Sequence, residues 1–145
     1  MLDKRLPEMQ RSRRGETVDE QAKKQLKVRV MMQGMLLGIA EVAKEDPAVQ
    51  AQLKGWERII QYSVRPDGPH MHLVVKGSDI TVAPGLNDKA SASIKFADLD
   101  TAVAIFSRKL EPQAAFMQGK IQLAGDMTDA MKMTMVSQLA MAYFI

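Results

Sequence analysis

The chain has 145 residues, about the size of one domain, and its lack of cysteine excludes disulfides, thiolate metal sites and cysteine nucleophiles. Its hydrophobic fraction of 46% and charged fraction of 26% are ordinary for a globular protein and indicate neither disorder nor a membrane protein. Residues 1–29 hold nine Lys/Arg against five Asp/Glu, which more than accounts for the net charge of +3, and no aromatic side chains alternate with these basic ones, so no nucleic-acid partner is expected.

The first part of the chain predicts a leader followed by a long helix. Residues 1–16 contain proline, glycine and many charges without periodicity, and we predict a flexible basic leader there. Thr17 and Glu20 have the spacing of a capping box, which predicts that a helix begins at Thr17 and runs to about Lys44. We expect one domain to span residues 17–145, with this helix as its N-terminal extension.

Near the middle of the chain the apolar pattern changes to strict alternation, which predicts strands. Two strands joined by the turn at 66–69 would form a hairpin with one polar face, and further strands are expected at 80–82 and 90–96. His70 and His72 lie two residues apart on the polar face of the hairpin. Because no third ligand is near them in the sequence, we expect exposed strand histidines and no metal site.

A helical period returns in the last third. An apolar stripe runs from Leu99 to Leu110, and proline and glycine bracket a short helix over 113–118 in the order that helices favour. A brief strand at 120–123 follows, and a final helix is expected to start after Asp126.

The end of this final helix is apolar on every side. Met133–Ile145 carries no charge, whereas a helix on a protein surface normally keeps a polar face. Three interpretations stay open: the helix is enclosed by the protein, it packs on a partner, or it covers an apolar ligand. The 12 methionines of the chain would suit an adaptable pocket and would serve equally well as ordinary core residues.

Two segments fix many positions over a short span. They are Ala-Ser-Ile-Lys-Phe-Ala-Asp-Leu-Asp at 92–100 and Glu-Pro-Gln-Ala-Ala-Phe-Met-Gln-Gly-Lys-Ile-Gln-Leu-Ala-Gly-Asp-Met at 111–127. In these segments, and more loosely from Met71 to Met133, the sequence resembles the lipid-binding domain of the sterol carrier protein type 2 family. The order of the expected helices and strands is also similar to the order in that family.

The resemblance implies an α+β fold: a five-stranded, mostly antiparallel, twisted sheet with helices packed on one face and an elongated apolar tunnel between them. The long N-terminal helix departs from the family pattern and could cap the tunnel or pair with another subunit. The residues that the resemblance places on the tunnel wall are Leu99, Val103, Phe106, Leu110, Phe116, Met117, Ile121, Leu123, Met127, Met131, Met135 and Leu139. A polar head group could be received by Gln118, Lys120 or Arg58.

Members of this family bind sterols, fatty acids, fatty acyl-CoA and phospholipids, so the resemblance implies non-catalytic binding and carriage of a lipid. The alternative is an accessory subunit that uses the same fold to dock to an enzyme of lipid or quinone metabolism, or to itself. The sequence contains no G-x-S-x-G elbow, no glycine-rich phosphate loop and no H-E-x-x-H motif, so neither catalysis nor a cofactor is expected.

Partners and location follow from the same features. We expect a lipid-like ligand, transient contact of the basic leader with a membrane surface, and a homodimer through the N-terminal or C-terminal apolar helix. The first 30 residues lack the apolar core of a secretory signal, and the final residues, Ala-Tyr-Phe-Ile, are not a peroxisomal signal, so the expected location is the cytoplasm.

Overall fold

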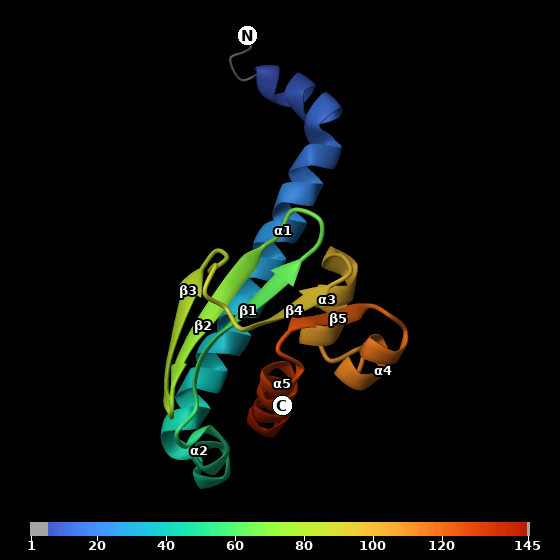
Figure 1. Cartoon of the computed structure of the whole chain (residues 1–145). Coiled ribbons are helices and arrows are strands. Elements are labelled where there is room, and N and C mark those ends of the chain that lie inside the picture. Colours follow the sequence, from blue (N-terminus) through green and yellow to red (C-terminus); the bar gives the residue numbers. More distant parts are fainter. Residues whose placement is uncertain (1–5, 145) are drawn as a thin grey trace.

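The computed structural model describes residues 6–144 of the chain, and from residue 19 onward it describes the side chains as well. The described residues form five strands and five helices, whose arrangement can be followed in Figure 1. In chain order they are α1 (Leu6–Glu45), α2 (Pro47–Leu53), β1 (Glu57–Val64), β2 (His70–Lys76), β3 (Asp79–Pro84), β4 (Ala92–Phe96), α3 (Leu99–Phe106), α4 (Pro112–Met117), β5 (Ile121–Gly125) and α5 (Met127–Met141).

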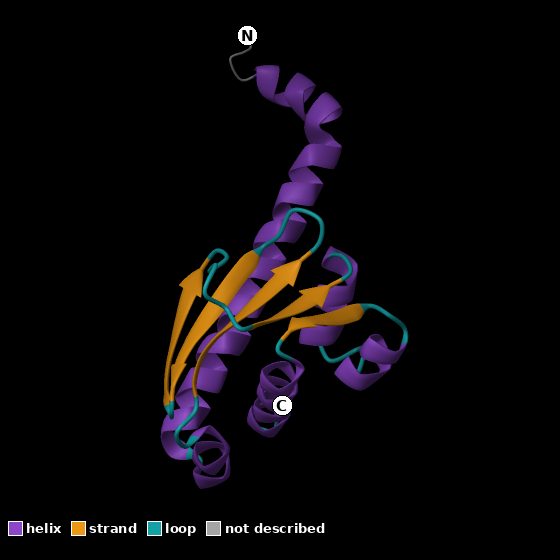
Figure 2. Cartoon of the chain, viewed as in Figure 1, coloured by secondary structure: helices purple, strands orange, loops and turns teal. Residues whose placement is uncertain are grey.

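The strands form one sheet in the order β3-β2-β1-β4-β5. The central pair, β1 and β4, is parallel, with Ile60 opposite Ala92, and the other three pairs are antiparallel. The helices pack on one face of this sheet, as Figure 2 shows. The predicted fold class is therefore confirmed: an α+β domain with a five-stranded, mostly antiparallel sheet and a long N-terminal helix.

The two faces of the sheet differ as the alternation predicted. Residues at every second position, such as Ile60 and Leu73, are buried under the helices. On the open face, Ser63 Oγ lies 2.7 Å from His70 Nδ1, and His72 Nδ1 lies 2.9 Å from the carbonyl oxygen of Gly85. Both histidines are half-buried and hydrogen-bonded, so the expectation that they are exposed was wrong. Among the side chains described, from residue 19 to residue 144, no three of His, Asp or Glu gather as a metal site would require.

Helix α1 lies across the helix-covered face of the sheet, and its first turns project beyond the sheet edge (Figure 1). Its buried residues Val28, Met32, Leu36 and Ile39 recur at three- and four-residue steps, which places one apolar stripe against the core. The helix begins at Leu6 and not at Thr17, because most residues between these positions are good helix formers that continue the helix through the capping sequence. The flexibility expected of the leader stays a prediction.

Two other boundaries differ from the sequence prediction. Helix α3 ends at Phe106 and does not reach Leu110, because Arg108 has a φ of 66° and a helix cannot continue through that left-handed conformation. Strand β4 begins at Ala92, since the N–H of Ala90 bonds to the carbonyl of Asn87 at 3.1 Å in the preceding turn.

Helix α5 packs against the sheet, α1 and α2 with only part of its surface. Its buried apolar residues are Ala130, Met133, Val136 and Ala140. Its outward side carries the residues that we call the α5 stripe, 38–62% exposed: Met127, Met131, Met135 and Leu139. Enclosure of this helix on every side, one of the three predicted alternatives, is therefore wrong.

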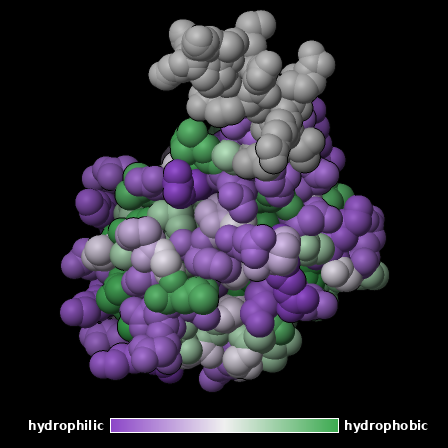
Figure 3. Space-filling model, turned by 90° about the horizontal axis from the view of Figure 1, so that it is seen from above, coloured by the Kyte–Doolittle hydropathy of each residue, from purple (hydrophilic) through white to green (hydrophobic). Residues whose placement is uncertain are grey.

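Apolar side chains also reach the surface elsewhere. In the face seen from above, hydrophobic side chains show at several separate places among hydrophilic ones (Figure 3). None of the helices of the described chain combines the length and apolarity that crossing a bilayer requires.

Candidate functional site

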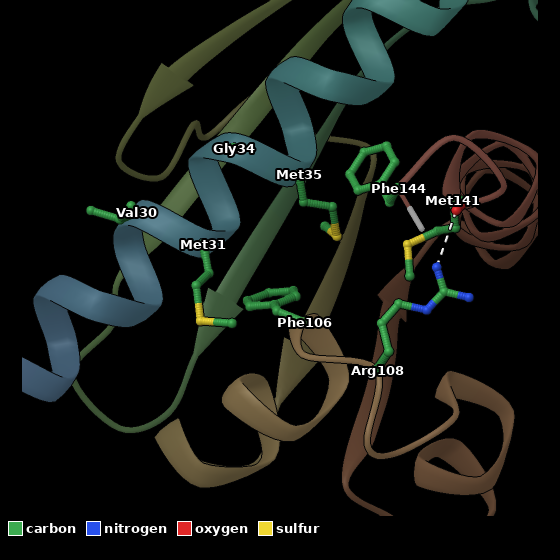
Figure 4. A pocket seen from close by; sticks show the side chains of 8 residues that line it. All are labelled: Val30, Met31, Gly34, Met35, Phe106, Arg108, Met141 and Phe144. Atoms are coloured by element: carbon green, nitrogen blue, oxygen red, sulfur yellow. Dashed lines mark hydrogen bonds between the residues drawn. The ribbon is translucent and has the colours of Figure 1, made fainter.

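A cavity of about 250 Å³ lies between α1, the end of α3 and the end of α5 (Figure 4). It is lined by Val30, Met31, Gly34, Met35, Phe106, Arg108, Met141 and Phe144. Seven of these eight residues are apolar, and Arg108 carries the one charge among them. The volume is slightly below the ~300 Å³ of the smallest usual ligand pockets, but three flexible methionines in the wall can repack around a guest.

The helices fix the cavity wall by simple spacing. Met31 and Met35 are four residues apart on α1, so they lie on the same side of the helix, one turn apart. Phe106 is the last residue of α3, and its ring packs edge-on against Phe96, with 5.4 Å between the ring centroids. This aromatic contact holds the Phe106 ring between the sheet and the cavity (Figure 4).

Arg108 caps the C-terminal ends of two helices, α3 and α5. Its backbone N–H bonds to the carbonyl of Ile105 at 3.0 Å, and the N–H of Lys109 bonds to the carbonyl of Ala104 at 2.8 Å, which together form a Schellman motif after α3. Its side-chain Nη1 donates to the carbonyl of Met141 at 3.1 Å, at the end of α5 (Figure 4). The guanidinium therefore lies at the rim of the cavity, beside the carbonyl end of α5.

The last residues of the described chain close one side of the cavity. The ring of Phe144 lies against Gly38, where an added Cβ would come within 2.5 Å of Phe144 Cζ. The hydroxyl of Tyr143 donates to Asp46 Oδ2, and this bond raises the pKa of Tyr143 and lowers that of Asp46. The absent side chain of Gly38 thus makes room for the aromatic end of the chain.

We expect Gly38→Ala to dislodge Phe144, whereas Gly34→Ala one turn earlier should not. A Cβ on Gly34 meets nothing within 4 Å, so that variant should gain about 0.5–1 kcal/mol of stability from the helix propensity of alanine. Gly38→Ala has the same gain but must push the aromatic ring away, which should leave it about 1–2 kcal/mol less stable than Gly34→Ala. Urea denaturation measures the difference.

A spectrophotometric titration checks the same displacement independently. In Gly38→Ala the pKa of Tyr143 should return toward its ordinary value, because the bond to Asp46 is lost. The other tyrosine does not interfere, since burial raises the pKa of Tyr62 to about 12. Equal stabilities of the two variants, with an unchanged Tyr143 titration, would contradict the contact.

A polar cluster joins the start of α5 to the sheet. The carboxylate of Asp129, 3% exposed, accepts hydrogen bonds from Ser91 Oγ (2.7 Å), Trp56 Nε1 (3.1 Å) and Arg58 Nε (2.9 Å). Burial alone raises the pKa of Asp129, but these hydrogen bonds and the Arg58 charge outweigh it and hold the pKa below its ordinary value. None of these residues lines the cavity, so we assign the cluster to stability.

The structure scatters the twelve residues predicted for the tunnel wall. Phe106 lines the cavity. Half-buried against the core are Val103, Leu110 and Leu123, and buried within it are Leu99 and Ile121. Exposed are Phe116 and Met117 on α4 and the four residues of the α5 stripe. The contact of these residues with a ligand stays a prediction.

The predicted head-group residues do not line the cavity. Gln118 and Lys120 are exposed beyond the end of α4, and Arg58 is paired with Asp129. The sequence interpretation named neither Arg108 nor Phe144 as a candidate for the site. The four-residue spacing of Met31 and Met35 was the one local signal for the α1 wall, and it does not distinguish a cavity from a core.

The fold and the cavity define a small α+β domain whose helices leave an apolar cavity between them. The sequence pattern of the SCP-2 sterol transfer family matches residues 39–138, more than half of the chain. The chain belongs to this family, as the resemblance predicted.

Relatives and solved structures agree with this assignment. Sterol carrier protein 2 of Rattus norvegicus is 42% identical over 59 residues, which cover 41% of this chain and 11% of the rat protein, so the chain matches about a tenth of that relative. The solution structure of palmitated SCP2L2 from Aedes aegypti has a TM-score of 0.57 at 19% identity, over 74% of this chain and 90% of that one. A UbiJ-SCP2 ubiquinone synthesis protein has a TM-score of 0.57 at 16% identity, over 79% and 98%. At these identities the structures show a shared fold.

Proposed function

We propose that the protein binds and carries one lipid-like molecule without changing it chemically. The observation that carries the proposal is the apolar cavity between α1, α3 and α5. Membership of the family and the palmitated relative support it. Removing a few hundred Å² of hydrocarbon from water would supply several kcal/mol at about 25 cal/mol per Å², without any precisely placed hydrogen bond.

The size of the cavity sets a condition on this function. A space of about 250 Å³ equals the volume of roughly eight water molecules at ~30 Å³ each, which is too little for a whole lipid. We propose that the methionine wall opens further when a lipid enters. The predicted wall residues outside the cavity, including the α5 stripe, then cover the part of the lipid's hydrocarbon tail that the cavity does not hold. In this arrangement α5 moves toward the ligand.

Filling the cavity tests the proposal. Met35→Trp should weaken the binding of a fluorescent fatty acid at least about tenfold, because the larger ring takes the space of the guest. Leu37→Trp, an exposed position two residues away on the same helix, should change the affinity less than about twofold. Mass spectrometry of an organic extract of the purified protein should identify the natural lipid. Equal affinities of Met35→Trp and Leu37→Trp for the fatty acid, together with no lipid in the extract, would contradict the carrier function.

A second candidate function has its own observation. The α5 stripe, with Phe116 and Met117 of α4 also exposed, places six large apolar residues in solvent, and exposed apolar surface often marks a protein interface. An accessory subunit could use it to dock to an enzyme of lipid or quinone metabolism or to a second copy. The ubiquinone synthesis neighbour is compatible with this alternative. Membrane contact through the basic leader and a cytoplasmic location stay predictions.

A further inference from the structure

Arg108 occupies a backbone position that normally belongs to glycine. It is the one non-glycine residue of the described chain with a positive φ, 66°. The left-handed conformation is strained for an L-residue, and glycine avoids this strain. The chain itself provides the comparison, because α4 ends in the same motif with Gly119 at the equivalent place, at a φ of 76°. A strained residue in place of glycine indicates that its side chain has a role.

Capping of α5 accounts for only part of that side chain. A guanidinium has five N–H donors, and among the residues whose side chains are described, Arg108 makes one hydrogen bond through them, to the carbonyl of Met141. None of the residues that line the cavity is acidic, so the wall offers no carboxylate to pair with the charge. The cavity therefore combines an apolar wall with one permanent positive charge at its rim.

We propose that Arg108 binds the anionic head group of a single-chain lipid, a carboxylate or a phosphate ester, while the start of the hydrocarbon chain enters the cavity. This inference rests on the proposed lipid-binding function. The planar guanidinium matches both kinds of head group, and a charge-assisted hydrogen bond of this kind is stronger than a neutral one. A neutral lipid of the same length gains only the apolar contacts with residues such as Met35 and Phe106.

The test compares ligands of equal chain length: hexadecanoate, hexadecyl phosphate and hexadecan-1-ol, each displacing a fluorescent neutral lipid from the full chain. The wild type should bind both anions at least about tenfold more tightly than the alcohol. Arg108→Gln should reduce this preference to within about twofold, mainly by weakening the binding of the two anions. Lys109→Gln, the neighbouring exposed cation that does not line the cavity, should keep the full preference.

A second variant separates the loss of the guanidinium from a loss of folding. Arg108→Gly removes the guanidinium but fits the left-handed position better than arginine, so it should fold and still lose the preference for anions. Inorganic phosphate alone should not compete at concentrations where hexadecyl phosphate saturates the protein. Equal competition by both would assign the site to free phosphate and overturn the inference.

The outcomes separate this inference from the proposed function. A wild type that binds all three long-chain ligands equally, with no effect of Arg108→Gln or Arg108→Gly, keeps the carrier function and overturns the role of Arg108. A wild type that binds neither the acids nor the alcohol overturns both.

Discussion

Asp129→Ala should lower the free energy of unfolding by about 3 kcal/mol. The substitution removes the acceptor of three donors at once, and two of these donors belong to the buried Trp56 and the half-buried Ser91 beside the first turn of α5. Leaving buried polar groups unpaired usually costs about 1–3 kcal/mol each. The third donor, Arg58, keeps access to water, because its side chain is 45% exposed, and this holds the expected loss near the lower end of the range for a broken buried pair.

The matched control is Asp100→Ala. Asp100 also pairs with a cation, Lys24 Nζ at 2.9 Å, but both side chains are exposed, so the loss should be a small fraction of the loss in Asp129→Ala. Urea denaturation at neutral pH measures both variants. Similar losses for the two aspartates would show that the buried cluster does not hold α5.

The pH dependence of the wild type follows from the same carboxylate. Because the folded pKa of Asp129 is below its ordinary value of 3.8, its stabilisation is fully present above that value and is lost as the pH falls through the folded pKa. The stability difference between the wild type and Asp129→Ala should therefore be constant from pH 7 to about pH 5 and shrink in more acidic solution. A difference that grows on acidification would contradict the low pKa.

Met131→Glu should weaken lipid uptake by about a hundredfold or more and leave the stability of the lipid-free protein unchanged. Met131 is 62% exposed in the free protein, so water hydrates a carboxylate there. If α5 closes over the ligand, the same carboxylate becomes buried without a partner, which costs several kcal/mol. Titration with a fluorescent fatty acid and thermal unfolding of the free protein measure the two quantities.

The control is Leu37→Glu, a half-exposed apolar position on another helix, which should bind lipid as the wild type does. Native mass spectrometry of both variants tests the alternative that the α5 stripe docks to a partner. If Met131→Glu takes up lipid normally and loses a complex that the wild type forms, the α5 stripe is a docking surface. The second candidate function then replaces closure of α5 over a ligand.

Most of the fold could be predicted because its signals are local. The alternation of Ala92, Ile94 and Phe96 defines a strand with one buried face, and the structure buries all three. The break between the first two helices is also local in origin, because Pro47 begins α2 and Asp46 caps it through the N–H groups of Ala48 and Val49. The parallel pairing of β1 with β4 has no local signal, and only the resemblance to the family implied the complete sheet.

The candidate site was harder to predict for two physical reasons. Its wall comes from α1, the end of α3 and the last residues, and much of it, such as Met35 and Phe144, lies outside the segment that resembles the family. In addition, an apolar pattern all round α5 cannot tell which side is buried. Met133 is fully buried and Met131 is exposed, although both are methionines in the same uncharged helix, because contacts with distant strands decide between them.

Helix α5 is attached at both ends. At its start Asp129 binds three donors from the sheet side, and at its finish Arg108 holds the carbonyl of Met141 while Tyr143 reaches Asp46. A helix anchored at both ends cannot rotate outward about one end as a rigid body. If the protein binds a lipid as proposed, α5 must bend in the middle or detach at one end, so the residence time of the lipid should depend on which attachment breaks first.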